Sequence, residues 1–330
     1  MNASSSTASA WMGLGVIACA LPVLAVPAAH AQTFPTKPVR GIVANAAGGN
    51  SDLVARMAAE GLARELGQSV YVENQPGGRQ IPATQLVARA TPDGHTLLAV
   101  GLTFTVNAVL YNDLPYDSIK DFAPVGVVGS TPQLVVATPS LPANNIKELI
   151  ALAKTKPDTI HYSSTGVAST AHLGAELLAS MAGIKLVHVA YKGTAQANTD
   201  TMTGVVELSL AGPISLVSLV RSGKLKALGI SSSKRSPQMP DVPAIAETVP
   251  GYEFILWNGI AAPAATPKPV ITRLNAALNK GITSPDIKDK LFKAGVEIDP
   301  QSPEQMATYV EVEIRKLTKL VREAKIQGER

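Results

Sequence analysis

The chain contains one cysteine, Cys19, among its 330 residues, and this cysteine lies in an apolar N-terminal stretch. The features described below indicate that this stretch belongs to a cleaved signal peptide. The mature chain that remains after cleavage would have no thiol, which excludes disulfides, thiolate metal sites and a cysteine nucleophile. An exported protein without disulfides depends on its core for stability. The roughly 300 residues that remain are enough to bury such a core, and their number favours two domains.

The sequence also lacks a strong excess of either charge. It has 29 lysines and arginines against 25 acidic residues, a formal net charge of +4. The basic residues are scattered and form neither a basic tract nor a basic pattern interleaved with aromatics, so we expect no binding to nucleic acid. A mildly cationic surface does help to attract small anions.

The N-terminal segment 1–31 has no lysine or arginine, so the amino terminus is its one positive charge. Its apolar stretch 12–29 contains two prolines and leads into Ala29-His30-Ala31. These features are typical of a secretory signal peptide cleaved near Ala31, rather than of a membrane span. Residues 16–19 loosely resemble a lipoprotein cleavage box. The apolar run continues past them, so we expect export without lipidation.

Strand-like and helix-like patterns alternate along the mature chain, which predicts an α/β fold rather than a sandwich or a bundle. The expected strands are 38–44, 68–74, 95–101, 133–139, 161–164, 185–191, 206–212 and 226–232. The expected helices are 51–67, 82–90, 145–156, 169–183, 194–204, 214–224, 267–282 and 303–325, the last part of the chain being wholly helical in pattern.

The loop ANAAGGNSD (44–52) joins the first strand to the first helix. Gly48 and Gly49 have no Cβ, so their backbone can adopt a positive φ and approach a ligand closely. Asn50 or Ser51 can cap the helix, whose free N–H groups and positive dipole end then bind anions, including carboxylates. The alternative is an ordinary strand-to-helix turn. The glycine spacing fits neither a dinucleotide-binding loop nor a P-loop.

Two further strand-to-helix junctions have a similar composition. Residues 162–173 form a Ser/Thr-rich turn around Gly166, with Ser169 or Thr170 as the helix cap, and residues 191–198 form the other turn. In open α/β sheets, ligands bind beyond the carboxyl ends of the strands, so the three turns can converge on one cleft between domains. The alternative is that each hydroxyl only caps its own helix.

An enzyme is a weaker interpretation of the same residues. Ser169, His172 and Asp200 suggest a hydrolase triad, but the chain has no G-x-S-x-G motif, and a serine in its own helix cap is already hydrogen-bonded. His172 is more typical of a structural histidine. No two mature histidines have metal-ligand spacing with a carboxylate. We therefore expect no catalytic residue, no metal and no cofactor.

Short characteristic segments follow one another over nearly the whole mature chain. They are FPTKPVRGIV (34–43), AAGGNSD (46–52), VENQPGG (72–78), TPDGHTLL (91–98), LPYDSIKDFAPV (114–125), STGVASTAHLGAELLASMAG (164–183), VHVAYKG (187–193), SGKLKALGISSSKRSPQMPDVPAIAE (222–247), GYE (251–253), WNG (257–259) and APAATPKP (262–269). The number, order and spacing of these segments make the chain resemble the extracytoplasmic solute-binding receptors of tripartite tricarboxylate transporters, which are also called Bug-type receptors.

The resemblance implies a two-domain Venus-flytrap fold of the periplasmic-binding-protein type II kind, with the ligand cleft between the lobes. Residues 34–134 and 260–330 would form the first lobe, and residues 135–259 the second. The chain would cross between the lobes near 134–138 and near 257–263. Such a receptor is periplasmic and is expected to be monomeric.

The resemblance also implies which residues bind the ligand. The first lobe would contribute the loop between its first strand and helix, and the second lobe the Ser/Thr-rich turn, with ordered waters bridging part of the carboxylate. Three further candidates complete the set. The implied ligand-binding residues are Ala47, Gly48, Gly49, Asn50, Ser51, Arg79, Thr103, Ser164, Thr165, Gly166, Ser169, Thr170 and Ala211.

Two departures from the family bear on the ligand. Many relatives have an aspartate where this chain has Ala211, and an aspartate there could pair with a ligand ammonium, so an amino-acid ligand is not expected. Arg79 stands in a turn where relatives have small residues, and its guanidinium could bind a second carboxylate. Alternatively, Arg79 faces solvent.

The family resemblance predicts a receptor that captures a di- or tricarboxylate, or an aromatic carboxylate, and delivers it to the permease subunits of a membrane transporter. One alternative is a flytrap sensor that hands its closed form to a signalling partner. Another is a secreted serine hydrolase.

Overall fold

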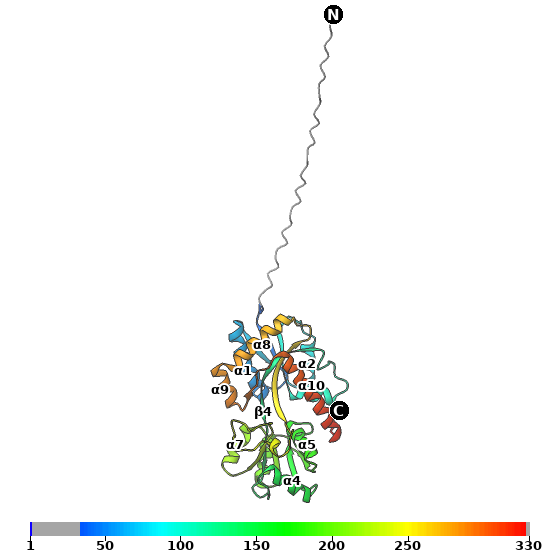
Figure 1. Ribbon diagram of the computed structural model, residues 1–330, viewed down its shortest axis with the longest axis vertical. Helices are drawn as coiled ribbons and strands as arrows, with labels where there is room; N and C mark the ends of the chain where they lie inside the picture. Colours follow the sequence, from blue (N-terminus) through cyan, green and yellow to red (C-terminus); the bar gives the residue numbers. More distant parts are fainter. Residues whose placement is uncertain (2–33, 328–330) are drawn as a thin grey trace. The chain divides into compact units, whose positions relative to one another are not determined.

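The part of the chain that the computed structural model describes, residues 34–327 together with Met1, contains two separate β-sheets. The predicted signal peptide, its cleavage site and Cys19 lie outside this part. We refer to each sheet with its covering helices as a lobe. Figure 1 shows the first lobe with α1, α8, α9 and α10, and the second with α4, α5 and α7.

The first lobe has a mixed six-stranded sheet in the order β11-β4-β10-β3-β1-β2. The strand β1 pairs in parallel with β2 and β3, whereas β10 is antiparallel to β3 and β4 on either side. Its strands are β1 (Val39–Val43), β2 (Val70–Asn74), β3 (Thr96–Gly101), β4 (Phe122–Pro132), β10 (Ile255–Pro263) and β11 (Glu297–Ile298). Its helices are α1 (Asn50–Leu66), α2 (Ile81–Ala88), α3 (Leu102–Leu110), α8 (Lys268–Thr283), α9 (Pro285–Lys293) and α10 (Pro303–Glu323).

The second lobe has a five-stranded sheet in the order β7-β6-β8-β5-β9. The chain enters it after Pro132 and leaves it after Ile230, returning to the first sheet at Ile255. Its strands are β5 (Leu134–Ala137), β6 (His161–Ser164), β7 (Val187–Ala190), β8 (Leu208–Ala211) and β9 (Lys226–Ile230). Its helices are α4 (Ile146–Thr155), α5 (Thr170–Ala182), α6 (Thr194–Thr203) and α7 (Pro213–Arg221).

The structure adds five helices and strands to those expected from the sequence: β4, β10, α3, α9 and the short β11. The strand β10 contains Gly259 and ends at Pro263, and β4 contains Pro124 and two glycines, which are residues that argue against a strand. Irregular register between β4 and β10 accommodates them. The expectation that the last part of the chain is wholly helical was wrong, because β11 precedes α10.

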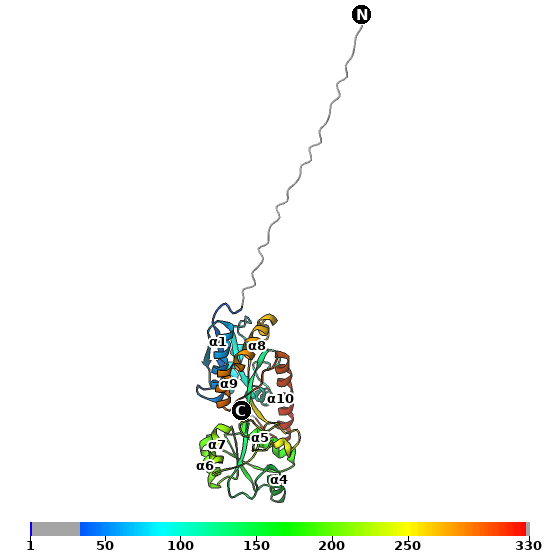
Figure 2. The same cartoon turned by 60° about the vertical axis from the view of Figure 1, so that its left-hand side comes forward.

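Helix α10 contacts both lobes (Figures 1 and 2). Its Tyr309 ring lies edge-on to Trp257 of β10, with 5.5 Å between ring centroids. Farther along, Lys316 Nζ donates to the carbonyl oxygen of Glu253 at 3.2 Å, and Glu323 accepts from Ser180 of α5, also at 3.2 Å. The C-terminal helix therefore connects the two lobes.

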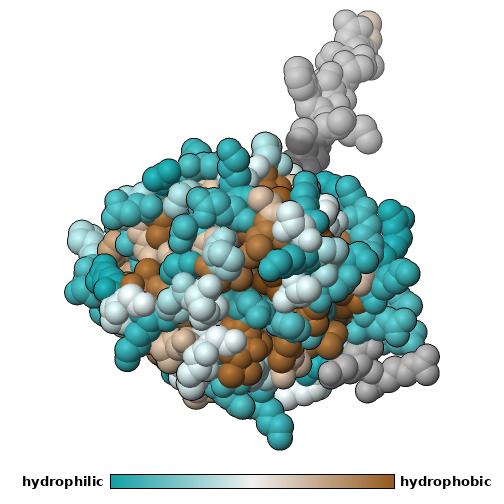
Figure 3. All heavy atoms as spheres, turned by 90° about the horizontal axis from the view of Figure 1, so that it is seen from below, coloured by the Kyte–Doolittle hydropathy of each residue, from teal (hydrophilic) through white to brown (hydrophobic). Residues whose placement is uncertain are grey.

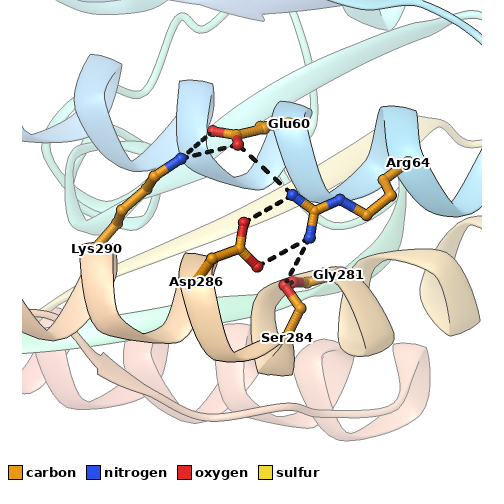
Figure 4. Close-up of polar contacts among 6 residues, drawn as sticks. All are labelled: Glu60, Arg64, Gly281, Ser284, Asp286 and Lys290. Atoms are coloured by element: carbon orange, nitrogen blue, oxygen red, sulfur yellow. Dashed lines mark hydrogen bonds and ion pairs between the residues drawn. The ribbon is translucent and has the colours of Figure 1, made fainter.

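On the opposite face of the first sheet, ion pairs connect α1 to α9 (Figure 4). Arg64 makes a bidentate contact with Asp286, at 2.7 and 2.9 Å, and Lys290 Nζ lies 2.8 Å from both carboxylate oxygens of Glu60. The Arg64 guanidinium donates to Asp286 and holds the pKa of that carboxyl well below its usual range. These contacts are solvent-exposed, so they add geometric order rather than much stability.

Exposed large apolar side chains come from separate elements, among them Leu53 of α1, Val205, Ile214 of α7 and Phe292 of α9. Apolar and polar side chains are interspersed on the face that Figure 3 shows. Scattered exposure of this kind is ordinary for a protein surface. Within residues 34–327, no helix combines the length and apolar character needed to cross a membrane.

Candidate ligand-binding site

A cavity of about 210 Å³ lies where the first turns of three helices meet. Ser51 comes from α1, Thr103 from α3 and Thr170 from α5, so both lobes contribute to its wall. Residues 256–260 of β10 form another side. The volume suits a small molecule, since sites for drug-sized ligands occupy about 300–1,000 Å³.

Two adjoining hollows extend this cavity. One, of about 290 Å³, shares Thr170 and lies on the second lobe along β8. The other, of about 400 Å³, shares Asn45, Gln80 and Thr103 and reaches residues 167–169 of the second lobe. Together they form a cleft lined by both lobes.

Most of the predicted ligand-binding residues lie in this cleft, and some do not. Those that line it are Ser51, Arg79, Thr103, Ser164, Thr165, Ser169, Thr170 and Ala211. Those outside its lining are Ala47, Gly48, Gly49, Asn50 and Gly166. Lining residues that the sequence did not single out are Asn45, Gln80, Gln133, Ser209 and Asn258.

The start of α1 differs from the prediction. Asn50 and Ser51 do not cap the helix, because both lie inside it; the N-cap is Gly49, which has an extended backbone with φ of −76°. Only Gly48 has a positive φ, of 84°. The freedom that glycine provides is therefore needed at Gly48 and not at Gly49.

The carboxylate of Asp52 occupies the N-terminal end of α1. Its Oδ2 accepts hydrogen bonds from Gly48 N at 2.9 Å and from Arg56 Nε at 3.0 Å, and its Oδ1 accepts from Asn74 Nδ2 at 2.8 Å. Burial raises the pKa of Asp52, but these hydrogen bonds outweigh burial and leave it below its ordinary value. The Asp52 carboxylate therefore accepts a hydrogen bond from the Gly48 N–H, in the loop where the sequence predicted free N–H groups for a ligand.

The start of α3 has no such internal anion. Its N-cap, Gly101, has no side chain to offer, and the first turn contains no acidic residue. A Cβ on Gly101 would lie 2.6 Å from the carbonyl oxygen of Trp257, so close pairing of β3 and β10 requires glycine there. The N–H groups and the positive dipole end of α3 thus border the cavity without a charge partner in that turn.

In the second lobe, the N-cap of α5 is Ser169, which was predicted as the cap together with the alternative Thr170. Its Oγ accepts from the main-chain N–H of His172 at 3.3 Å. Ser164 Oγ lies 2.5 Å from His188 Nε2 and accepts from Gly166 N at 3.0 Å. These hydroxyls order the turn itself, which supports the capping interpretation for Ser169.

A stack of aromatic rings lies behind that turn. His172 and His188 are stacked, with 4.2 Å between ring centroids and 24° between the ring planes, and Tyr162 stacks 5.2 Å from His188. The Tyr162 hydroxyl donates to Glu176 at 2.6 Å. Burial lowers the pKa of His172, and burial together with the nearby His172 lowers the pKa of His188. Both rings are therefore stabilised in their neutral form.

The imagined hydrolase triad is not assembled. His172 Nδ1 accepts from the N–H of Ala168 at 3.0 Å, so that nitrogen is not available to a serine. Asp200 is hydrogen-bonded to the hydroxyl of Tyr191. In the described part of the chain, no group of three or more His, Cys, Asp or Glu side chains is placed to hold a metal ion.

Arg79 lies in the 400 Å³ hollow and has an unusual backbone. Its φ is 54°, and its carbonyl oxygen accepts from Asn107 Nδ2 at 2.8 Å. The guanidinium carbon lies 5.3 Å from the centroid of the Tyr111 ring, a cation–π contact. This places a cation beside the cleft, although Arg79 itself is exposed.

Comparison with known proteins identifies the fold. The sequence profile of the family described as "Tripartite tricarboxylate transporter family receptor" matches residues 54–326. BugT of Bordetella pertussis is 33% identical over 298 residues, which are 89% of this chain and 91% of BugT. The solved structure of the periplasmic binding protein BugD has a TM-score of 0.71 and 33% identity, and the match covers 90% of this chain and 100% of BugD.

Two further solved structures contain ligands. Rpa4515 of R. palustris with adipate has a TM-score of 0.74 and 33% identity, covering 89% of this chain and 99% of that one. MatC of Rhodopseudomonas palustris with bound malate has a TM-score of 0.70 and 31% identity, covering 87% and 100%. These matches confirm the predicted two-lobe α/β fold. The chain belongs to the receptor family of the tripartite tricarboxylate transporters.

Proposed function

We propose that this protein is an exported, periplasmic receptor that binds a small carboxylate between its lobes and delivers it to the permease of a tripartite tricarboxylate transporter. The observation that supports this most directly is the cavity of about 210 Å³ bordered by the first turns of three helices. Helix N-termini are suited to anions because their N–H groups and dipoles point the same way.

The predicted two-lobe division, 34–134 with 260–330 and 135–259, remains the framework of this proposal. The ligand would lie against the lining residues of the first lobe, and Thr170 and the Ser164-Thr165 turn would cover it from the second. Closure of the lobes would exclude water and strengthen each hydrogen bond. We expect one protein chain to bind one ligand, as a monomer.

The favoured ligand is a carboxylate without an ammonium group. Ala211 lines the second-lobe part of the cleft, where it offers no charge to an amino group. Arg79 provides a cation for a second carboxylate. The related proteins solved with adipate and with malate hold dicarboxylates, which supports a diacid for this chain as well.

We propose binding without turnover. The matching family and the neighbouring structures are transport receptors and binding proteins. Ser169 is engaged as a helix cap, and His172 Nδ1 is engaged by the main chain. The sequence of the segment 1–31, together with the periplasmic BugD as a neighbour, supports export to the periplasm.

Thermal melting of the mature chain with a panel of carboxylates tests this function. The panel contains acetate, succinate, malate, adipate, citrate and benzoate, with aspartate and glutamate as amino-acid controls. A ligand at about 100 times its Kd stabilises the native state by roughly 2.7 kcal/mol. We expect at least one diacid to raise the Tm and to be recovered unchanged. A panel without effect, or a response confined to the amino acids, would contradict the proposal.

A further inference from the structure

Asn258 of β10 is buried and lacks a hydrogen-bond acceptor for its side-chain amide. Only 6% of the residue is exposed, and within residues 34–327 no group accepts a hydrogen bond from Nδ2. Its main chain pairs with Gly101 on one side and Gly129 on the other. A buried donor without an acceptor destabilises the folded state, so its presence calls for an explanation.

The alternation of β10 shows which face carries this amide. Trp257 contacts Tyr309 of α10, and a Cβ on Gly259 would lie 3.0 Å from Met306 of the same helix. Ile260 packs on the other face, in the core cluster that contains Val54 of α1. Because successive side chains point to opposite faces of a strand, Asn258 lies on the α1 face with Ile260. There it lines the cavity of about 210 Å³.

The surroundings of the amide are uncharged. None of the described residues that line this cavity is an Asp, Glu, Lys or Arg. Ser51 and Thr103 contribute hydroxyls from the first turns of α1 and α3. Asp52 already accepts from the loop before α1, whereas the first turn of α3 has no acid and Gly101 provides no cap. Asn258 and the start of α3 therefore bound one position in this cavity that still requires an acceptor.

We propose that Asn258 is a ligand-binding residue whose Nδ2 donates a hydrogen bond to a ligand carboxylate held at the N-terminus of α3. This inference rests on the proposed function of the same cleft and assigns the anchoring group within it. The carboxylate is bound by neutral donors and the helix dipole, with the hydroxyls of Thr103 and Ser51 beside it.

The test uses the mature full chain and sodium acetate as the smallest carboxylate probe, titrated to 100 mM at constant ionic strength with sodium chloride. Two-dimensional 15N NMR follows the side-chain amides. The Asn258 pair is assigned by triple-resonance experiments on the wild-type protein, and its absence in Asn258→Ala checks the assignment. In the wild-type protein, these two signals and the backbone N–H of Thr103 should shift saturably with acetate. Unshifted Asn258 signals would overturn the inference even if no variant could be purified.

Asn258→Asp keeps the size of the side chain and replaces the donor with a negative charge. We expect its apparent affinity for acetate to fall at least tenfold, and that of Asn258→Ala to fall about fivefold or more. Asn275→Asp is the matched control, because Asn275 Nδ2 donates to the carbonyl oxygens of Val125 and Gln301. It should lower the Tm while leaving the acetate affinity within twofold of wild type.

The outcomes separate this inference from the proposed function. If a panel carboxylate stabilises the wild type and Asn258→Asp binds it and acetate as tightly, the receptor function stands and Asn258 is not the anchor. If Asn275→Asp loses affinity as Asn258→Asp does, the effect is general and the inference also fails. If the wild type responds to no carboxylate, both proposals fail.

Discussion

Gly61 of α1 and Gly281 of α8 meet at the point where these two helices cross. A Cβ on Gly61 would lie 2.9 Å from the Cα of Gly281, and a Cβ on Gly281 would lie 2.6 Å from the carbonyl carbon of Gly61. Real Cβ atoms do not approach backbone atoms so closely. The backbones of α1 and α8 therefore touch, and neither helix can accept a side chain at the crossing without moving.

The first prediction concerns this crossing. Alanine is the better helix former by about 1 kcal/mol, so Gly61→Ala or Gly281→Ala would stabilise an open helix. Here we expect each substitution to destabilise the protein by about 1–3 kcal/mol, because the added methyl group overpacks the contact. Urea denaturation of both variants measures the change. A gain in stability in either one would show that the helices separate readily.

The second prediction concerns Asp52. Asp52→Asn removes the charge that accepts from Gly48 and Arg56 and places a donor against donors. We expect a loss of about 1.5–3 kcal/mol at pH 7, the range for hydrogen bonds to a charged group. The exposed Asp113→Asn is the charge-matched control and should change stability by less than about 0.5 kcal/mol.

The pH dependence of Asp52 follows from the direction of its shift. Its pKa in the folded protein is lower than in the unfolded chain, so the unfolded state binds the proton more readily. The stabilisation is present above about pH 4, the ordinary aspartate range, and is lost as the pH falls through the folded pKa. Melting curves from pH 6 to pH 2.5 should therefore converge for wild type and Asp52→Asn. Parallel curves would contradict this assignment.

The third prediction concerns His172, whose pKa is also lowered in the folded state. The neutral ring contributes stability above the unfolded pKa of about 6.5, and this contribution is lost as the pH falls below that value. His172→Asn retains an acceptor for the Ala168 N–H but does not titrate. We expect its Tm to fall less than that of wild type between pH 8 and pH 5. An equal fall would assign the acid sensitivity to other groups.

The fourth prediction concerns Arg79 and depends on the proposed binding site. Arg79→Gln removes the cation but keeps a polar side chain of similar length. If Arg79 binds a second carboxylate, affinity for a diacid should fall by about 1.5–3 kcal/mol, roughly tenfold or more, whereas affinity for a monoacid should change little. Calorimetry with a matched diacid and monoacid measures the difference. Equal losses for both ligands would assign Arg79 a structural role.

Much of the fold could be predicted from the sequence. Alternating apolar patterns placed β1, β2, β3 and the strands of the second lobe, because each has the spacing of a half-buried or fully buried strand. The two long central strands β4 and β10 were not predicted, since their prolines and glycines argue against a strand unless the partner has an irregular register. That register is a property of two segments far apart in the sequence.

The candidate site could be predicted only in part. The Ser/Thr-rich turn and its cap at Ser169 have a local signal, and the structure contains them. The start of α3 has no local sequence pattern that predicts a helix N-terminus. Its sequence LTFTVNAVL is rich in β-branched residues and follows a glycine, which has no capping side chain. No local sequence pattern marks Asn258 as a ligand-binding residue either, because its proposed role depends on its burial beside Gly101 of another strand.

The order of strands in the first lobe has a consequence for how the protein is made. The strand β10 lies between β3 and β4, although the whole second lobe separates it from them in the sequence. Until residue 263 leaves the ribosome, the first sheet has a gap at its centre and cannot close. The second lobe is complete in sequence before that point. The chain can therefore finish its N-terminal half only after most of its C-terminal half exists, a high-contact-order arrangement that delays folding. Such a delay suits the export proposed above, in which the polypeptide would cross the membrane before it has folded.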